Sequence, residues 1–207
     1  MSGATLDRPH VFVPAEEGAA GPPLLLLHGT GGDERDLLPL RDHLSPGAAV
    51  LSPRGTVMEG PMPRFFRRLR EGVFDEDDLR ARTDELADFV IAASAEHGIA
   101  RGSFVAVGFS NGANIASALL LRRPEVLAGA VLLAAMVPFA DVPEGPDLAG
   151  RRVVVSNGER DPMATAWHTG TLVAQLRGRG ADVTELPHAG GHQLDGSLLP
   201  QVAALLR

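Results

Sequence analysis

Short apolar runs alternate with longer amphipathic segments along this chain. Residues 24–27 form a continuous apolar run that ends at His28-Gly29, which is typical of a buried parallel strand. Similar short runs predict further strands at residues 48–51, 104–107, 130–134, 152–155 and 182–186. Apolar spacing and helix-stop signals between them predict helices at residues 35–44, 78–97, 110–123, 164–177 and 197–206.

Strands that alternate with helices predict an α/β fold, with a mostly parallel sheet flanked by helices. No repeat or low-complexity linker divides the sequence, so we expect residues 1–207 to form one domain without a separate cap. Residues 56–74 are expected to form an irregular connection. In such folds the active site lies beyond the carboxyl ends of the strands. The residues that follow the expected strands are His28 to Gly32, Arg54, Ser110, Met136, Asp161 and His192.

Composition narrows the classes of function. The formal net charge of −7 and the pI near 5.5 disfavour a nucleic-acid-binding protein, which usually presents a basic surface. The chain contains no Cys, no Lys and no Tyr. A thiolate nucleophile, a Cys-based metal site, a Schiff-base lysine and a Walker A lysine are therefore excluded. The nucleophiles that remain are Ser, Thr, Asp, Glu and His.

The sequence also bears on location. Residues 1–8 lack the basic-then-apolar pattern of a signal peptide. The longest apolar stretch, residues 128–140, contains Gly129 and Pro138 and is too short to cross a bilayer. We therefore expect a cytoplasmic protein without a membrane span. The oligomeric state stays open, with a homodimer among the options.

Residues 108–112 read Gly-Phe-Ser-Asn-Gly and match the pattern G-x-S-x-G. This pattern sits between an expected strand and an expected helix, as a nucleophile elbow requires. The sharp turn strains the backbone of Ser110 and leaves no room for side chains at Gly108 and Gly112. Ser110 is therefore the candidate nucleophile. The alternative is a Gly-rich turn with a passive serine.

A serine hydroxyl needs a general base to become an effective nucleophile. His192 follows the last expected strand, and Gly190-Gly191 before it allow the loop to bend over the sheet. His188 is the rival, because it lies four residues earlier in the same loop. The two glycines argue against a helical, metal-binding arrangement of the two histidines.

The acid that orients the histidine comes between the serine and the histidine in chain order in such folds. Asp161 follows the fifth expected strand, and Pro162 after it starts the next helix. Glu159 is the alternative acid. An ordinary helix-capping role for Asp161 is compatible with the orienting role.

Acyl transfer also needs two N–H donors for the oxyanion. The expected donors are the backbone N–H groups of Asn111, after the nucleophile, and of Thr30, in the Gly-rich loop after residues 24–27. A dinucleotide-binding loop does not fit, because Glu34 stands where the third glycine of that motif belongs.

These motifs resemble the phospholipase/carboxylesterase branch of the α/β hydrolases, over nearly the whole chain. The resemblance rests on the Leu-His-Gly-Thr-Gly-Gly-Asp-Glu block, the Gly-Phe-Ser-Asn-Gly elbow, Arg160-Asp161-Pro162 and Gly190-Gly191-His192. It extends to short bacterial members grouped with hydroquinone-resistance hydrolases, which similarly carry a Pro-Arg-Phe-Phe-Arg-Arg segment. It implies hydrolysis of small acyl or aryl carboxylic esters, without a cofactor or a metal ion. Larger members have Gln at the Asn111 position and often Leu at the Thr30 position.

The expected substrate pocket involves the connection that follows the second strand. Phe65 and Phe66 are candidates for its walls, and Trp167 for a place near Asp161. The candidates for contact with an anionic substrate are Arg64, Arg67, Arg68 and Arg70. The alternatives are that the phenylalanines belong to the core and that the arginines pair with acidic neighbours. Two other functions remain open: a thioesterase or lysophospholipase with the same triad, and a non-catalytic binding protein of this fold.

Overall fold

The side chains of the completely buried strand β2 alternate between two hydrophobic cores, one on each face of the main sheet. The computed structural model describes residues 7–206, and within them seven strands form the main sheet, in the order β1-β3-β2-β8-β9-β10-β11. All neighbouring strands run parallel except β1 and β3. The strands are β1 His10–Val13, β2 Leu24–Leu27, β3 Val50–Pro53, β8 Phe104–Phe109, β9 Leu127–Leu133, β10 Arg152–Ser156 and β11 Asp182–Glu185.

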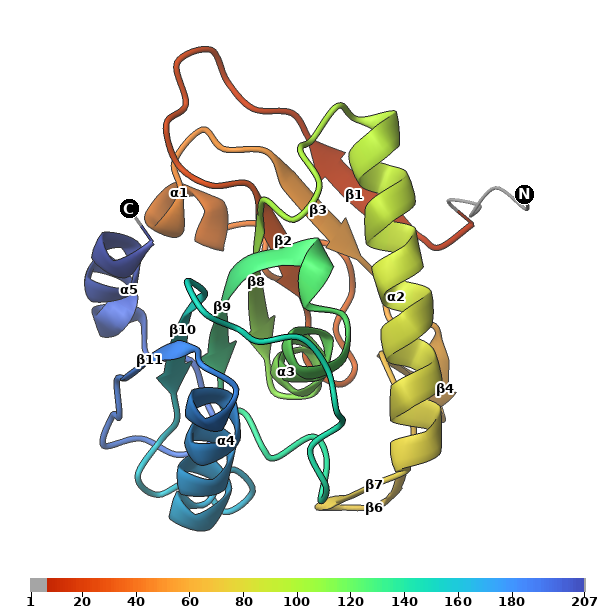
Figure 1. The fold of residues 1–207 in the computed structure, drawn as a ribbon, viewed down its shortest axis with the longest axis vertical. Coiled ribbons are helices and arrows are strands. Elements are labelled where there is room, and N and C mark those ends of the chain that lie inside the picture. Colours follow the sequence, from red (N-terminus) through yellow and green to blue (C-terminus); the bar gives the residue numbers. More distant parts are fainter. Residues whose placement is uncertain (1–6, 207) are drawn as a thin grey trace.

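Helices cover both faces of this sheet (Figure 1). They are α1 Leu40–Leu44, α2 Glu76–Glu96, α3 Asn111–Arg122, α4 Ala166–Gly178 and α5 Leu199–Leu205, with 3₁₀ turns at Pro124–Val126 and Gly196–Leu198. Leu25 and Leu27 pack in the core that contains α2, α3 and α4, whereas Leu24 and Leu26 pack with α1 and α5. The expected α/β-hydrolase architecture, a mostly parallel sheet between helices, is confirmed.

Three local expectations were wrong. Strand β1 was not expected, because its four residues are all half-buried and show no continuous apolar run. The helix expected at residues 35–44 starts only at Leu40, since the side chains of Asp33 and Asp36 accept hydrogen bonds from nearby backbone N–H groups and favour turns. Residues 57–74 are not irregular but form two small hairpins.

The hairpins follow β3 and precede α2. Strand β4 (Val57–Glu59) pairs with β5 (Met62–Arg64), and β6 (Arg68–Arg70) pairs with β7 (Val73–Phe74). Gly60 and Gly72 provide the positive φ angles, +58° and +73°, that the two tight turns require. Short strands of two or three residues carry too little periodicity to be predicted from sequence.

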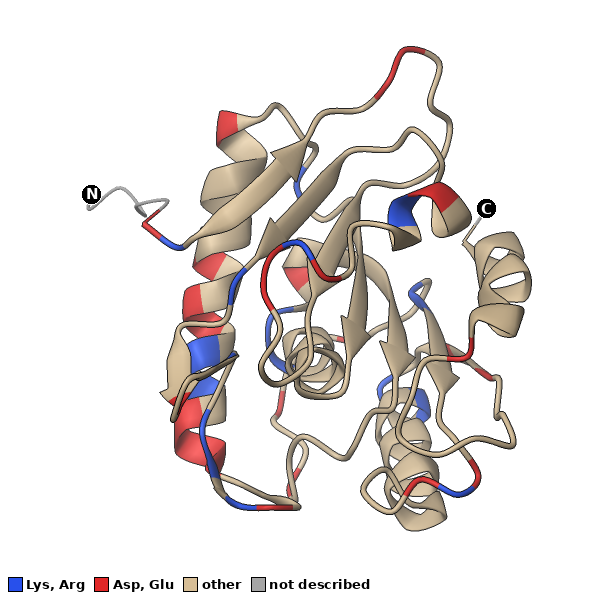
Figure 2. Ribbon diagram, turned by 180° about the vertical axis from the view of Figure 1, so that it is seen from behind, with Lys and Arg blue, Asp and Glu red and all other residues tan. Residues whose placement is uncertain are grey.

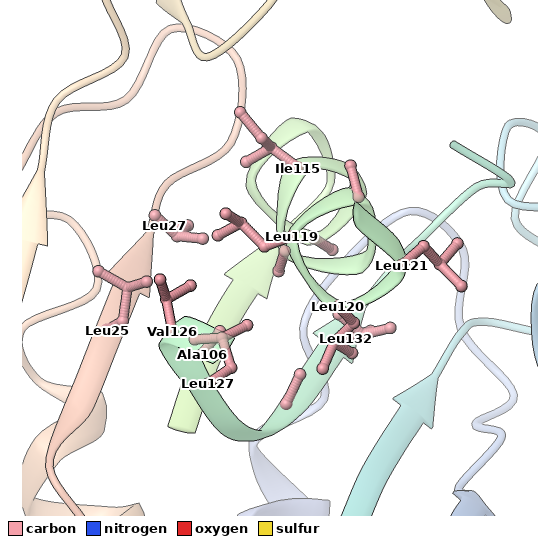
Figure 3. Packing of buried hydrophobic residues seen from close by; sticks show 14 of the residues in the cluster. Leu25, Leu27, Ala106, Ile115, Leu119, Leu120, Leu121, Val126, Leu127 and Leu132 are labelled. Atoms are coloured by element: carbon pink, nitrogen blue, oxygen red, sulfur yellow. The ribbon is translucent and has the colours of Figure 1, made fainter. Parts of the chain in front are cut away.

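The start of α3 packs very closely against β2 and β8. A Cβ atom on Gly112 would lie 1.9 Å from the carbonyl oxygen of Leu27, and one on Gly108 would lie 2.5 Å from the backbone of Gly112. Beneath this contact, Leu119 and Leu120 of α3 pack over Leu27 and over neighbouring residues of β8 and β9 (Figure 3). Glycine is therefore needed at both positions for steric reasons.

Among residues 7–206, no helix combines the length and the apolar character needed to cross a membrane.

The close approach of α3 to β2 leads to a first prediction, on the stability of glycine variants. Gly112→Ala should lower the free energy of unfolding by about 1–3 kcal/mol, the usual cost of overpacking, or prevent folding. Gly170→Ala, inside α4 where an added Cβ would have open space around it, should instead raise it by about 0.5–1 kcal/mol. Urea denaturation of both variants measures the difference. A Gly112→Ala protein as stable as the wild type would contradict the packing described above.

Candidate active site

Ser110 lies at the sharp turn between β8 and α3. Its backbone has φ +53° and ψ −114°, a conformation that costs energy for any residue with a side chain. Two backbone hydrogen bonds hold it there: its N–H donates to Leu133 (2.8 Å), and its carbonyl accepts from Asn114 (2.9 Å). The hydroxyl is thereby presented at the carboxyl end of the sheet.

Ser110, His192 and Asp161 form a hydrogen-bonded chain. His192 Nε2 lies 2.8 Å from Ser110 Oγ, and His192 Nδ1 lies 2.8 Å from Asp161 Oδ2. A neutral ring that carries its proton on Nδ1 fits both contacts, since it donates to the carboxylate and accepts from the hydroxyl. The ring of Phe109 packs beside the imidazole, with 5.5 Å between the ring centroids.

Asp161 uses its two carboxylate oxygens for two different tasks. Oδ1 accepts the backbone N–H groups of Met163 (2.8 Å) and Ala164 (3.0 Å), while Oδ2 faces His192. Its side chain is completely buried. The local turn therefore fixes the carboxylate that orients the imidazole, and the turn-capping role coexists with the contact to His192. The alternative acid, Glu159, is exposed.

His188 does not contact Ser110. It is buried, its Nδ1 accepts the N–H of Gly190 (3.1 Å), and its backbone N–H donates to Asn157 (3.3 Å). His188 thus folds the loop that carries His192, and only His192 of the two reaches the serine.

Thr30 and Asn111 lie with Ser110 around a small cleft that opens to solvent. Within residues 7–206, neither of their backbone N–H groups donates to a protein acceptor. The N–H of Asn111 belongs to the first turn of α3, where helix N–H groups have no partner in the helix. The arrangement suits the binding of negative charge at this point.

Residues 55–66 brace both sides of this cleft. Pro63 accepts the N–H of Gly31 (2.9 Å), and Arg64 Nη1 donates to Thr30 Oγ1 (2.6 Å). The N–H of Phe65 donates to Asn111 Oδ1 (2.7 Å). The segment therefore ties the loop after β2 to the start of α3.

His28 anchors the beginning of the same segment. Its Nε2 accepts the N–H of Gly55 (2.9 Å), while Nδ1 lies 2.6 Å from the carbonyl of Gly29. Burial lowers the pKa of His28, with the Gly29 carbonyl as the main opposing influence. The neutral ring is the form that accepts from Gly55, so the lowered pKa and the hydrogen bond agree.

The expectation that Phe65 and Phe66 form pocket walls was wrong. Both side chains are completely buried in the core under α2 and α3, and neither lines the cleft. Phe74 lines it instead, and the ring of Phe66 supports Phe74 edge-on from behind, at 5.0 Å between centroids. Phe65 and Phe66 lie inside the core because burial of their large apolar surface stabilises the fold.

The other two expected substrate contacts have different outcomes. Arg64 does line the cleft and is only 3% exposed. Trp167 does not: it stands in the first turn of α4, is 67% exposed, and packs against the ring of His168. Its position shortly after Asp161 in the sequence predicts proximity to the cleft, but its side chain lies on the exposed surface of α4.

Several cleft residues were not singled out by the sequence. Asn114, one helical turn after Asn111, accepts the N–H of Met136 through Oδ1 (2.8 Å). Gly72, Phe74, Met136 and Met163 also line the cleft, together with Arg68, which the sequence did offer as a candidate for an anionic substrate. Met136 was noted only as a residue that follows a strand. The signal in the sequence that could have indicated Asn114 is its spacing of three residues from Asn111, which places both on one side of a helix.

A partly buried ion pair supports the loop after β2. Glu34 is 5% exposed and accepts two hydrogen bonds from Arg54, at 2.5 and 2.8 Å. The hydrogen bonds from Arg54 lower the pKa of Glu34. The pair links this loop to the end of β3.

A second, larger hollow lies between β10, β11 and α4. Its lining includes Asn157, Glu159 and Thr169 but none of the three residues of the hydrogen-bonded chain. The chemistry of Ser110 therefore belongs to the smaller cleft.

Comparison with known proteins supports one family. No family model matches the sequence. The chain is 49% identical over 185 residues to a protein of Bacillus subtilis (strain 168) named "Putative hydrolase MhqD", and the match covers 89% of this chain and 90% of that protein. The crystal structure of the Bacillus cereus carboxylesterase is 43% identical, with a TM-score of 0.91, over 96% of this chain and 92% of that one. A carboxylesterase from Mesorhizobium loti is 31% identical, with a TM-score of 0.87, over 96% and 94% of the two chains.

These likenesses agree with the motifs and with the fold. Identity of about one half extends over nine tenths of both the chain and its Bacillus subtilis relative, and the two carboxylesterase structures share the whole architecture. The chain belongs to the phospholipase/carboxylesterase family of the α/β hydrolases.

Proposed function

We propose that the protein is a serine carboxylesterase that acts through an acyl-enzyme, with Ser110 as nucleophile, His192 as base and Asp161 as orienting acid. The observation that carries the proposal is the continuous hydrogen-bonded chain through the three side chains. Two similar structures are named carboxylesterases, which supports ester hydrolysis as the reaction.

In the first half-reaction, Ser110 Oγ attacks the ester carbonyl while His192 Nε2 takes the hydroxyl proton. The tetrahedral intermediate then expels the alcohol, which receives that proton from His192, and the acyl group stays on Ser110. In the second half-reaction, His192 takes a proton from water, whose oxygen attacks the acyl carbon. The acid leaves, and Ser110 regains its proton from His192.

Two parts of the site lower the barrier electrostatically. Asp161 holds His192 in the required tautomer and stabilises the imidazolium that forms. The backbone N–H groups of Thr30 and Asn111 receive the oxyanion of each tetrahedral intermediate. Because the fold already holds these donors in place, little reorganisation is needed during the reaction.

The size of the cleft supports small acyl or aryl esters as substrates. The cleft beside Ser110 encloses little space, which suits a short acyl chain better than the long chain of a lysophospholipid. Met136, Met163 and Phe74 supply its apolar lining.

Replacement of the nucleophile is the direct test of this function. Ser110→Ala should keep the fold and lower kcat on p-nitrophenyl acetate by about 10⁴-fold or more, because the three residues act as a unit. A fluorophosphonate probe should label the wild type and not the variant. Ser197→Ala, at an exposed serine outside the cleft, is the control and should retain both properties. Wild-type activity in Ser110→Ala would overturn the proposal.

The two histidines of the last loop should differ sharply. His192→Ala removes the only imidazole in contact with Ser110 and should reduce kcat by about 10⁴-fold or more. His188→Ala removes a support of the loop and should reduce kcat only modestly. Steady-state kinetics with circular dichroism as a folding check measures both. The opposite ranking would assign the base to His188.

Substitution of Phe65 should affect stability, whereas substitution of Phe74 should affect substrate preference. Phe65→Ala should lower the free energy of unfolding by about 3–5 kcal/mol, since it leaves a cavity in the core. Phe74→Ala, in the cleft wall, should change the preference between acetyl and longer acyl esters by about 1–3 kcal/mol. Denaturation curves and kcat/KM across an acyl-length series are the measurements. A changed acyl preference in Phe65→Ala without loss of stability would return that ring to the pocket.

A further inference from the structure

The cleft beside Ser110 contains a buried guanidinium group with unused donors. Arg64 lines the cleft, and its side chain is 4% exposed. Its Nε donates to the carbonyl of Phe66 (3.1 Å) and its Nη1 to Thr30 Oγ1 (2.6 Å). Among residues 7–206, its Nη2 donates to no protein acceptor. These two contacts hold the guanidinium group in place and leave Nη2 available to a ligand.

The positive charge of Arg64 is only partly balanced. Its acidic neighbour is Glu59, whose Oε2 lies 3.4 Å from Arg64 Nε. The same carboxylate accepts three hydrogen bonds of 2.7–3.1 Å from Arg68. Two guanidinium groups therefore share one carboxylate. Burial, and then the charge of Arg68, lower the pKa of Arg64, as expected for a cation without a counter-ion of its own.

The charged residues that line the cleft, Arg64 and Arg68, are both basic. Figure 2 shows blue and red segments side by side along the hairpins and the lower half of α2. The acidic residue next to the two arginines is Glu59, which pairs with both. A net positive wall thus stands near Ser110 in a chain whose overall charge is −7.

A second, independent donor belongs to a residue that lines the same cleft. Asn111 is 2% exposed, and its Oδ1 accepts the N–H of Phe65, which fixes the orientation of the amide. Its Nδ2 is buried and has no hydrogen-bond partner among the described residues. Buried polar groups without partners are rare, because each carries a desolvation penalty that a ligand acceptor would remove.

We propose that Arg64 and Asn111 form a subsite for a carboxylate group of the substrate. This inference rests on the proposed function and deepens it: the preferred substrates are small esters whose acyl or alcohol part carries a carboxylate near the reacting carbonyl. Arg64 Nη2 and Asn111 Nδ2 donate to the carboxylate oxygens, and charge-assisted hydrogen bonds of this kind are strong. The backbone N–H groups of Thr30 and Asn111 remain free for the oxyanion.

Paired substrates test the subsite on each side of the ester bond. Methyl hydrogen succinate and methyl succinamate differ in a carboxylate on the acyl side. Acetoxyacetate and acetoxyacetamide differ in a carboxylate on the alcohol side. In one pair the wild type should prefer the acid over the amide in kcat/KM by about 10–100-fold, the range of a hydrogen bond to a charged group. Equal rates, or a preference for the amide in both pairs, would overturn the proposal.

A variant of Arg64 separates recognition from support of Thr30. Arg64→Gln removes the charge and should bring the preferred acid:amide ratio close to one, mainly through KM of the acid. Arg70→Gln, at an exposed arginine outside the cleft, is the matched control and should leave the ratio unchanged. Equal losses on acid and amide in Arg64→Gln would mean that Arg64 only supports the loop, and would overturn the subsite.

Binding without turnover distinguishes failure of the subsite from failure of the enzyme. Isothermal titration calorimetry of methyl hydrogen succinate and acetoxyacetate is performed on Ser110→Ala and on Ser110→Ala with Arg64→Gln. Binding that the second substitution weakens by about 10-fold or more supports the subsite, even if the wild type fails to react with fluorophosphonate. Reaction with the probe and no Arg64-dependent binding would retain the esterase and reject the subsite.

Discussion

The contact between the start of α3 and the end of β2 is the constraint on which the site depends. Gly112 lies against the carbonyl of Leu27, closer than any side chain would permit. This approach brings the loop after β2 beside the first turn of α3, so that Thr30, Ser110 and Asn111 border one cleft. The strained backbone of Ser110 persists because β8 and α3, on either side of it, are held by a completely buried core (Figure 3).

A second set of contacts depends on the first. Once the loop after β2 and the start of α3 are adjacent, residues 55–66 can bind both. Side chains of His28 and Asn111 accept the backbone N–H groups of Gly55 and Phe65, which would otherwise be buried without partners. Residues 55–66 are therefore held by side chains that satisfy their buried backbone, and one of these side chains, Asn111, also lines the cleft.

The sequence predicted the fold and the main candidates for chemistry because those residues follow strands. In a parallel sheet the residues after neighbouring strands meet, so Ser110, Asp161 and His192 could be named without coordinates. The places of Phe65, Phe66 and Trp167 could not be obtained this way. Whether an aromatic ring in a connection turns inward depends on the space left by α2 and α3, and the short hairpin strands carry no periodic signal.

The cleft presents more donors than acceptors, and its donors divide by role in the proposed reaction. The backbone N–H groups of Thr30 and Asn111 would meet charge that develops on the reacting carbonyl, and such interactions accelerate the chemical step. Arg64 and the amide of Asn111 would meet a charge that the substrate carries throughout, which improves binding equally before and during the reaction. Because Arg64 also holds Thr30 through its hydroxyl, a carboxylate bound at the proposed subsite and the proposed oxyanion donor would share one support. Selection of the substrate and placement of the reacting carbonyl would then be mechanically linked.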